Sequence, residues 1–257
     1  MMKQTMRRLA AVTCLFSLPV LAGEQIDYQW DNEMFSGYLA TPSSVEKGSV
    51  VIIHDWDGLT EYEQQRADML AGMGYRVFAL DMFGKGNRPQ TLEAKRAATG
   101  ALYKDRARMQ TLIQAGMEAA KSQGIEAPVV AGYCFGGTVT LELARNPQQM
   151  PVSGYASFHG GLETPSGQAY SQDIAPLFIA HGGADKAVPM SEFAQLINEL
   201  EAANLDYWSQ VYAGAPHAFT VFGSERYREQ ADKQSWQAFN QFLSEQLSVD
   251  LANQQGI

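Results

Sequence analysis

The chain has 257 residues, of which 46% are hydrophobic and 18% charged. This composition supplies one large domain with a substantial core and excludes a disordered chain. The formal net charge of −9 excludes a general basic surface for phosphate backbones, so we expect no nucleic-acid partner.

The N-terminal segment has the parts of a secretory signal peptide. Lys3, Arg7 and Arg8 precede the apolar run Leu9–Leu18, and Val20-Leu21-Ala22 offers small residues suited to cleavage. The apolar stretch up to Ala22 has 14 residues, too few for a membrane anchor, which needs roughly 20. We therefore expect residues 1–22 to be removed, leaving residues 23–257 as a periplasmic or secreted protein without a membrane anchor.

Loss of this segment changes both the charge and the cysteine content. It removes three positive charges and no acidic ones, so the net charge goes from −9 to −12. Cys14 leaves with it, and Cys134 becomes the one cysteine of the mature chain. An internal disulfide is therefore excluded.

In chain order, the hydrophobic pattern alternates between strand and helix periods. Strands are expected at Gln25–Trp30, Phe35–Ala40, Ser49–His54, Tyr75–Leu80, Pro128–Tyr133, Val152–Phe158, Leu177–His181 and Tyr207–Tyr212. Helices are expected at Tyr62–Met73, Leu92–Gln123 with a break near Thr99-Gly100, Thr138–Arg145, Met190–Ala203 and Tyr227–Leu247. The pattern predicts a single α/β domain: an N-terminal antiparallel hairpin, then a mostly parallel sheet with helices on both faces.

Polar residues gather at the predicted carboxyl ends of these strands, where open α/β sheets bind ligands. They are His54, Asp55, Asp81, Cys134, His159, His181, Asp185 and His217. We expect the functional site among them.

The segment Gly132-Tyr133-Cys134-Phe135-Gly136 fits a nucleophile elbow with cysteine in place of serine. The glycines leave room where strand and helix pack closely, and the helix N-terminus favours a thiolate. By itself this short match is weak, because a glycine turn with a buried cysteine has the same pattern.

The order of the later residues strengthens it, because α/β-hydrolases run nucleophile, acid, then histidine. Asp185, in HGGADKAVP, and His217, in AGAPHAF, each follow a predicted strand. His217 would exchange protons with Cys134, while Asp185 fixes its tautomer. His159 and His181 are weaker candidates for the base. For the oxyanion hole, the candidate donors are the backbone N–H of Phe135 and that of Trp56, in the loop after Ser49–His54.

Together, the motifs GYCFGG, HDWDGL, ALDMFG, HGGADKAVP and HAF resemble the dienelactone hydrolase family of α/β-hydrolases, over about Tyr28 to Leu247. The resemblance implies hydrolysis of a small-molecule lactone or carboxylic ester, with no metal or organic cofactor. It also implies that Cys134, His217 and Asp185 form the triad. We expect a monomer or a dimer.

Two positions depart from the family pattern. The best-known members have a glutamate that interacts with the resting thiol where this chain has Asp55, which is one methylene shorter. Dienelactone-cleaving members hold the substrate carboxylate with arginines, one of them at the position of Val221. Arg88 or Arg96 could supply positive charge instead, and His54 is a further candidate for substrate contact.

Three kinds of function remain open. The first is a thiol-dependent esterase or lactonase that works through an acyl-cysteine. The second is a hydrolase-fold binding or scavenging protein whose thiol does not turn over. The third is an acyltransferase or peptidase with the same triad.

Overall fold

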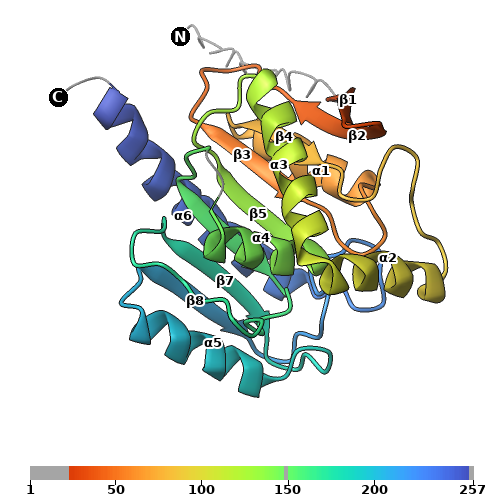
Figure 1. The fold of residues 1–257 in the computed structure, drawn as a ribbon. Coiled ribbons are helices and arrows are strands. Elements are labelled where there is room, and N and C mark those ends of the chain that lie inside the picture. Colours follow the sequence, from red (N-terminus) through yellow and green to blue (C-terminus); the bar gives the residue numbers. More distant parts are fainter. Residues whose placement is uncertain (1–22, 148–149, 255–257) are drawn as a thin grey trace, which may run out of the picture.

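An eight-stranded sheet runs through the centre of the molecule, in the order β1-β2-β4-β3-β5-β6-β7-β8 (Figure 1). The computed structural model describes residues 23–147 and 150–254, with side chains up to residue 248. The predicted signal peptide, residues 1–22, lies outside the described residues. The strands are β1 (Glu24–Trp30), β2 (Glu33–Ala40), β3 (Ser49–Ile53), β4 (Arg76–Leu80), β5 (Val129–Tyr133), β6 (Gly154–Phe158), β7 (Leu177–Gly182) and β8 (Tyr207–Tyr212).

The first two strands form the predicted hairpin. They pair antiparallel from Glu24 opposite Leu39 to Trp30 opposite Glu33. β2 then pairs antiparallel with β4, and every later pairing, from β4–β3 to β7–β8, is parallel. The carboxyl ends of the parallel strands therefore meet at one edge of the sheet, as predicted.

Helices cover both faces of the sheet. They are α1 (Glu61–Gly72), α2 (Leu92–Lys104), α3 (Arg106–Ser122), α4 (Phe135–Arg145), α5 (Met190–Ala202) and α6 (Glu229–Gln254). One core lies under α3, α4 and α5, and the other lies under α1 and α6. β3 shows why both faces are apolar: Val51 and Ile53 point into the first core, and Val50 and Ile52 into the second.

The break in the long helical region was predicted in the wrong place. The helix continues through Thr99 and Gly100 and ends at Lys104, one turn later. Asp105 ends α2 and begins α3, because its side chain accepts a hydrogen bond from the Arg108 N–H at 2.9 Å. A capping aspartate, rather than the glycine, therefore separates the two helices.

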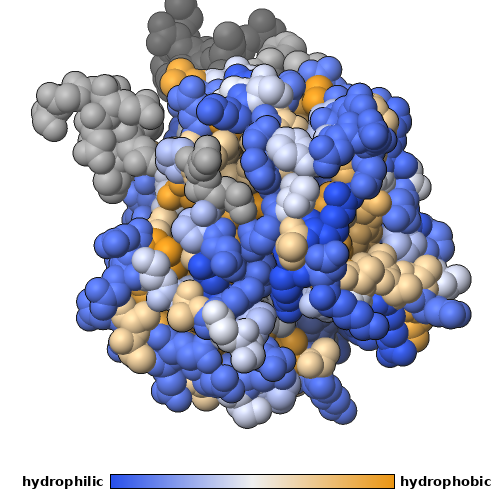
Figure 2. All heavy atoms as spheres, in the orientation of Figure 1, coloured by the Kyte–Doolittle hydropathy of each residue, from blue (hydrophilic) through white to orange (hydrophobic). Residues whose placement is uncertain are grey.

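The face in Figure 2 is mostly hydrophilic, with apolar residues in small separate groups. Within the described part of the chain, no helix combines the length and the apolar character that crossing a membrane requires.

Candidate active site

The chain makes a strained turn between β5 and α4. Cys134 has φ 51° and ψ −111°, a backbone conformation that only glycine adopts freely. A Cβ on Gly132 would lie 2.0 Å from the Gly136 carbonyl oxygen, and one on Gly136 would lie 2.1 Å from the Ile53 oxygen. The two glycines are therefore required for the start of α4 to pack against β5 and β3. The turn leaves the Cys134 side chain partly exposed.

Three side chains from separate loops meet at this turn. The Nε2 atom of His217 lies 3.1 Å from Cys134 Sγ, and its Nδ1 atom lies 2.8 Å from Asp185 Oδ2. The other oxygen of Asp185 accepts hydrogen bonds from the Ala187 and Val188 N–H groups, at 2.8 and 2.9 Å. The loop after β7 thus holds Asp185, which in turn orients the His217 ring.

These contacts shift two pKa values. Burial acts to lower the pKa of His217, but the hydrogen bonds to Asp185 and Cys134 outweigh it and raise the pKa to about 10. Burial acts to raise the pKa of Asp185, but the His217 hydrogen bond and charge and the two backbone N–H groups lower it. The arrangement therefore favours a protonated His217 ring, held between Asp185 and Cys134, at neutral pH.

One expected oxyanion donor, the Phe135 N–H, lies at the turn, and the other, the Trp56 N–H, lies in the loop after β3. Phe135 is the first residue of α4, and Trp56 belongs to the loop after β3, which the start of α4 touches. Among residues 23–147 and 150–254, neither the Phe135 N–H nor the Trp56 N–H donates a hydrogen bond. Both N–H groups can therefore donate to a substrate oxygen.

Asp55 does not bond to the sulfur atom. Its carboxyl Oδ1 accepts a hydrogen bond from the Asp57 N–H at 2.9 Å, and no hydrogen bond joins it to Cys134 within the described chain. Burial, followed by a hydrogen bond with Asp57 and the charges of Glu63, Asp57 and Cys134, raises the pKa of Asp55 to about 10. Asp55 is therefore a protonated acid at neutral pH.

The carboxylates of Asp55, Asp57 and Glu63 come within 4.8 Å of one another, close enough for a metal site. Their oxygen atoms already have partners, however. Glu63 accepts from the Asp55 N–H, the Thr60 N–H and the Thr60 hydroxyl, and Asp57 pairs with Lys95 at 3.1 Å. We assign no metal to this cluster.

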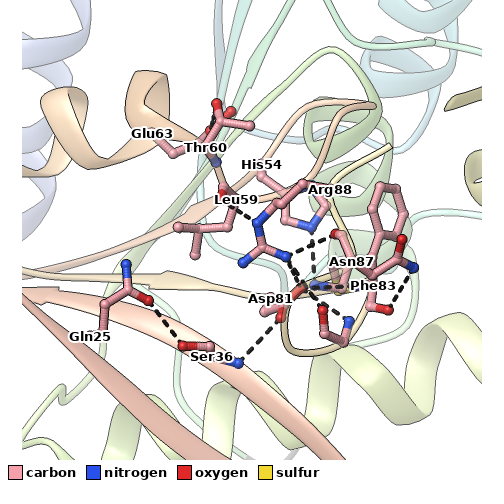
Figure 3. Close-up of polar contacts among 12 residues, drawn as sticks. Gln25, Ser36, His54, Leu59, Thr60, Glu63, Asp81, Phe83, Asn87 and Arg88 are labelled. Carbon is pink, nitrogen blue, oxygen red and sulfur yellow. Dashed lines mark hydrogen bonds and ion pairs between the residues drawn. The ribbon is translucent and has the colours of Figure 1, made fainter. Parts of the chain in front are cut away.

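His54 and Arg88 belong to a second polar cluster, centred on Asp81 (Figure 3). The Nδ1–H of buried His54 donates to the Asp55 carbonyl at 2.6 Å, and its Nε2 accepts from the Met82 N–H at 3.0 Å. Neither ring nitrogen is left for a substrate. Burial lowers the pKa of His54, in accord with a neutral ring.

Arg88 is likewise occupied. It donates to the carbonyl oxygens of Leu59, Gly84 and Asn87, and it lies 3.5 Å from Asp81. Of the other two positions in question, Arg96 is exposed on α2, and Val221 packs partly buried against the core under α1 and α6. Val221 thus has no charge, and Arg88 is held in place through its Nε and Nη1 atoms.

The other two histidines do not contact the sulfur in the described structure. His181 is buried and stacks on Phe193. The Nδ1 atom of His159 accepts a hydrogen bond from the Cys134 backbone N–H at 3.2 Å. Sequence reasoning weighed His159 only as a base and missed this contact. The one available signal was its place at the end of the strand next to β5.

Tyr103 is a further residue that sequence reasoning missed. Its ring packs on Phe135 with centroids 5.7 Å apart, and its hydroxyl lies 3.4 Å from Thr138 Oγ1. Tyr103 belongs to α2, so no motif near the elbow in the sequence predicts its contact with Phe135.

Comparisons with known proteins identify similar chains. A protein of Saccharolobus solfataricus named as a carboxymethylenebutenolidase is 23% identical, and the match covers 86% of this chain and 97% of that protein. A Bradyrhizobium protein named as a 2-oxo-3-(5-oxofuran-2-ylidene)propanoate lactonase is also 23% identical, over 84% of this chain and 91% of its own. Both matches span nearly the whole of the relative.

Among solved structures, a dienelactone hydrolase-like promiscuous phosphotriesterase from metagenomic libraries is similar, with a TM-score of 0.78 and 26% identity. That match covers 87% of this chain and 98% of the other. The model of the dienelactone hydrolase family matches residues 35–247, which include the elbow and the loops of Asp185 and His217. The chain therefore belongs to the dienelactone hydrolase family of α/β-hydrolases and is a hydrolase of carboxylic esters or lactones.

Proposed function

We propose that the chain cleaves a carboxylic ester or lactone with Cys134 as nucleophile, His217 as acid and base, and Asp185 as the residue that orients His217. One observation carries the proposal: the continuous contact from Asp185 through His217 to the sulfur, at 2.8 and 3.1 Å. A thiolate beside an imidazolium is a strong nucleophile at neutral pH, whereas a neutral thiol is a poor one.

In the first half of the reaction, the sulfur attacks the carbonyl carbon of the substrate. The carbonyl electron pair moves onto oxygen, where the N–H groups of Trp56 and Phe135 stabilise the negative charge. Collapse of this intermediate breaks the carbon–oxygen bond. The departing alkoxide takes the proton from His217 Nε2, and an acyl-cysteine remains.

In the second half, neutral His217 takes a proton from a water molecule as the oxygen of that water attacks the thioester. The carbon–sulfur bond then breaks, and the thiolate returns to its place beside the imidazolium. The products are a carboxylic acid and the free enzyme. Asp185 stays ionised throughout, since two backbone N–H groups also hold it.

We infer that neutral esters and lactones are better substrates than lactones that carry a carboxylate. Bidentate binding of a carboxylate needs a free guanidinium. Arg88 is held by backbone carbonyls through its Nε and Nη1 atoms, Lys95 is paired with Asp57, and Val221 carries no charge. A neutral acyl group instead meets aromatic surface from Tyr103.

The test compares purified protein with Cys134→Ala and His217→Ala on short p-nitrophenyl esters and on neutral and carboxylate-bearing lactones. We expect both variants to lose at least about a thousandfold in kcat. Mass spectrometry of wild-type protein trapped at acid pH is expected to find the acyl group on Cys134. Full activity in Cys134→Ala would refute the mechanism. Ester binding without turnover in wild type would instead assign a binding protein, and acyl transfer to an added amine or alcohol an acyltransferase.

We also propose that the protein is exported after cleavage behind Ala22. Support comes from the charged and apolar parts of the N-terminal segment. In a bacterial host, N-terminal sequencing of the protein from the periplasmic fraction is expected to begin at Gly23. A product that begins at Met1 in the cytoplasmic fraction would contradict this.

A further inference from the structure

A buried chain of hydrogen bonds runs beneath the cysteine and links it to the loop of His217. The Cys134 N–H is shared between the Phe158 carbonyl, at 3.0 Å, and His159 Nδ1, at 3.2 Å. On the other side of the ring, His159 Nε2 lies 2.8 Å from the hydroxyl of Thr220. Both His159 and Thr220 are almost completely buried.

The contacts determine which nitrogen of His159 carries the proton. Because Nδ1 accepts from a backbone N–H, the proton is on Nε2, and Nε2 donates to Thr220 Oγ1. Burial, followed by the positive charges of His217 and Arg66 and by His181, lowers the pKa of His159 well below its ordinary range. The ring is therefore neutral, although it lies edge-on to His217 with centroids 5.4 Å apart.

Thr220 is held from two more directions. Its hydroxyl lies 2.6 Å from the hydroxyl of Tyr62, and its carbonyl accepts a hydrogen bond from Arg66 at 2.8 Å. Arg66 is itself buried and paired with Asp232 of α6. Thr220 is thus hydrogen-bonded to two residues of α1, and one of them, Arg66, connects it to α6.

Thr220 stands three residues after His217 in the same turn. Ala218, between them, has φ 60°, and its carbonyl accepts from the Val221 N–H at 3.2 Å. The direction of the His217 side chain therefore depends on where Thr220 is fixed. At the other end, His159 has φ 41° and contacts the strained Cys134 backbone.

We propose that His159 and Thr220 are positioning residues that set the distance between Cys134 and His217. The inference rests on the proposed function, in which Cys134 is the nucleophile and His217 is the base. The His159 ring is hydrogen-bonded to the backbone of Cys134 and to Thr220 in the turn of His217. These two bonds keep Cys134 Sγ and His217 Nε2 within hydrogen-bonding distance. His159 and Thr220 exchange no proton with the substrate. They act through Cys134 and His217.

The sharpest test removes the Thr220 hydroxyl at constant shape. Thr220→Val leaves the His159 Nε2–H without its acceptor, so we expect kcat for a p-nitrophenyl ester to fall about tenfold or more, with KM within about twofold. Thr220→Ser keeps the hydroxyl and is expected to restore kcat to within about threefold of wild type. Thr99→Val, the same change at a buried threonine of α2, is the matched control with wild-type kinetics.

A second measurement follows the thiol itself, without turnover. The rate of Cys134 alkylation by iodoacetamide against pH reports the thiolate, and we expect its rise to move to higher pH in Thr220→Val but not in Thr220→Ser. His159→Asn, which suits a positive φ, keeps an acceptor for the Cys134 N–H but is too short to reach Thr220. It is expected to shift the alkylation profile in the same direction.

The two proposals fail separately. If wild type hydrolyses esters but Thr220→Val keeps its kcat and alkylation profile, the positioning role is refuted and the proposed function stands. Equal losses in Thr220→Val and Thr220→Ser would also refute it, since they indicate packing alone. If wild type hydrolyses no ester, the proposed function fails. A shifted alkylation profile in Thr220→Val, but not in Thr220→Ser, would even then support the role of Thr220 in positioning His217 beside Cys134.

Discussion

Two polar clusters lie at the carboxyl edge of the same sheet, and they differ in where their hydrogen bonds end. Around Asp81, bonds from Ser36, Phe83 and Gly84 end on a buried carboxylate, and those of His54 and Arg88 end chiefly on the backbone (Figure 3). Around His217, the bonds end on a partly exposed sulfur. A histidine or arginine at a strand end therefore indicates a catalytic site only when its hydrogen-bond network includes a polar atom that is exposed to solvent.

The largest expected effect separates the two clusters by activity. Asp185→Asn removes the carboxylate that orients His217, so we expect kcat to fall about a thousandfold or more. Because the hydrogen bond and charge of Asp185 raise the pKa of His217, their loss lowers that pKa, and the alkaline limit of activity moves to lower pH. Kinetics from pH 5 to 10 measure both. Asp206→Asn, on the surface, is the control, and a wild-type profile in Asp185→Asn would contradict the assignment.

The second prediction separates the clusters by stability. In Asp81→Asn an amide N–H would face a backbone N–H, so we expect the free energy of unfolding to fall by about 2 kcal/mol or more. The kcat of the folded fraction should stay within about twofold of wild type. Urea unfolding and active-site titration measure the two quantities. Asp27→Asn breaks an exposed pair with Lys85 and is the control, with a free energy of unfolding close to that of wild type. A loss of kcat with unchanged stability in Asp81→Asn would show that the Asp81 cluster serves catalysis rather than stability.

Asp55 lies between the two clusters, and its pKa predicts a pH dependence. The folded pKa of about 10 exceeds the ordinary value of 3.8, so the folded chain keeps a proton that the unfolded chain loses. The contribution of Asp55 to stability is therefore complete below about pH 3.8 and is lost as pH rises towards 10.

Asp55→Asn preserves the neutral form at every pH. We expect its free energy of unfolding to exceed that of wild type by about 1 kcal/mol or more at pH 8, with the difference disappearing near pH 4. Urea unfolding at pH 4, 6 and 8 measures this. A constant difference across that range would show that Asp55 is ionised in the folded protein.

The smallest effect is expected at Arg88. Because its Nε and Nη1 atoms are bonded to backbone carbonyls, Arg88→Met should leave the KM for a carboxylate-bearing lactone within about twofold, while it lowers the free energy of unfolding by about 1 kcal/mol. Arg96→Met, on the exposed side of α2, is the control for loss of charge. A tenfold rise in KM for Arg88→Met alone would return Arg88 to the substrate site.

The sequence predicted most of the sheet, because each strand is a local apolar run bounded by turns. It also identified the residues that meet at the elbow, since a nucleophile motif and two strand-end loops come in a fixed order along the chain. The helix break at Asp105 was missed because a capping aspartate resembles any other aspartate in a polar stretch. The bonds of His159 and Thr220 join residues 61 apart, and no local pattern reveals which side chains meet across that distance.

The long sequence separation within the elbow network has a consequence for the order of folding. Cys134 and His217 are 83 residues apart, and β6, β7 and β8 lie between them. The thiol gains its partner only when these strands have paired in order, which is a late, non-local step. Until the last loop docks, a folding chain carries Cys134 without its histidine partner, so under the proposed mechanism its reactivity arises only with the completed fold.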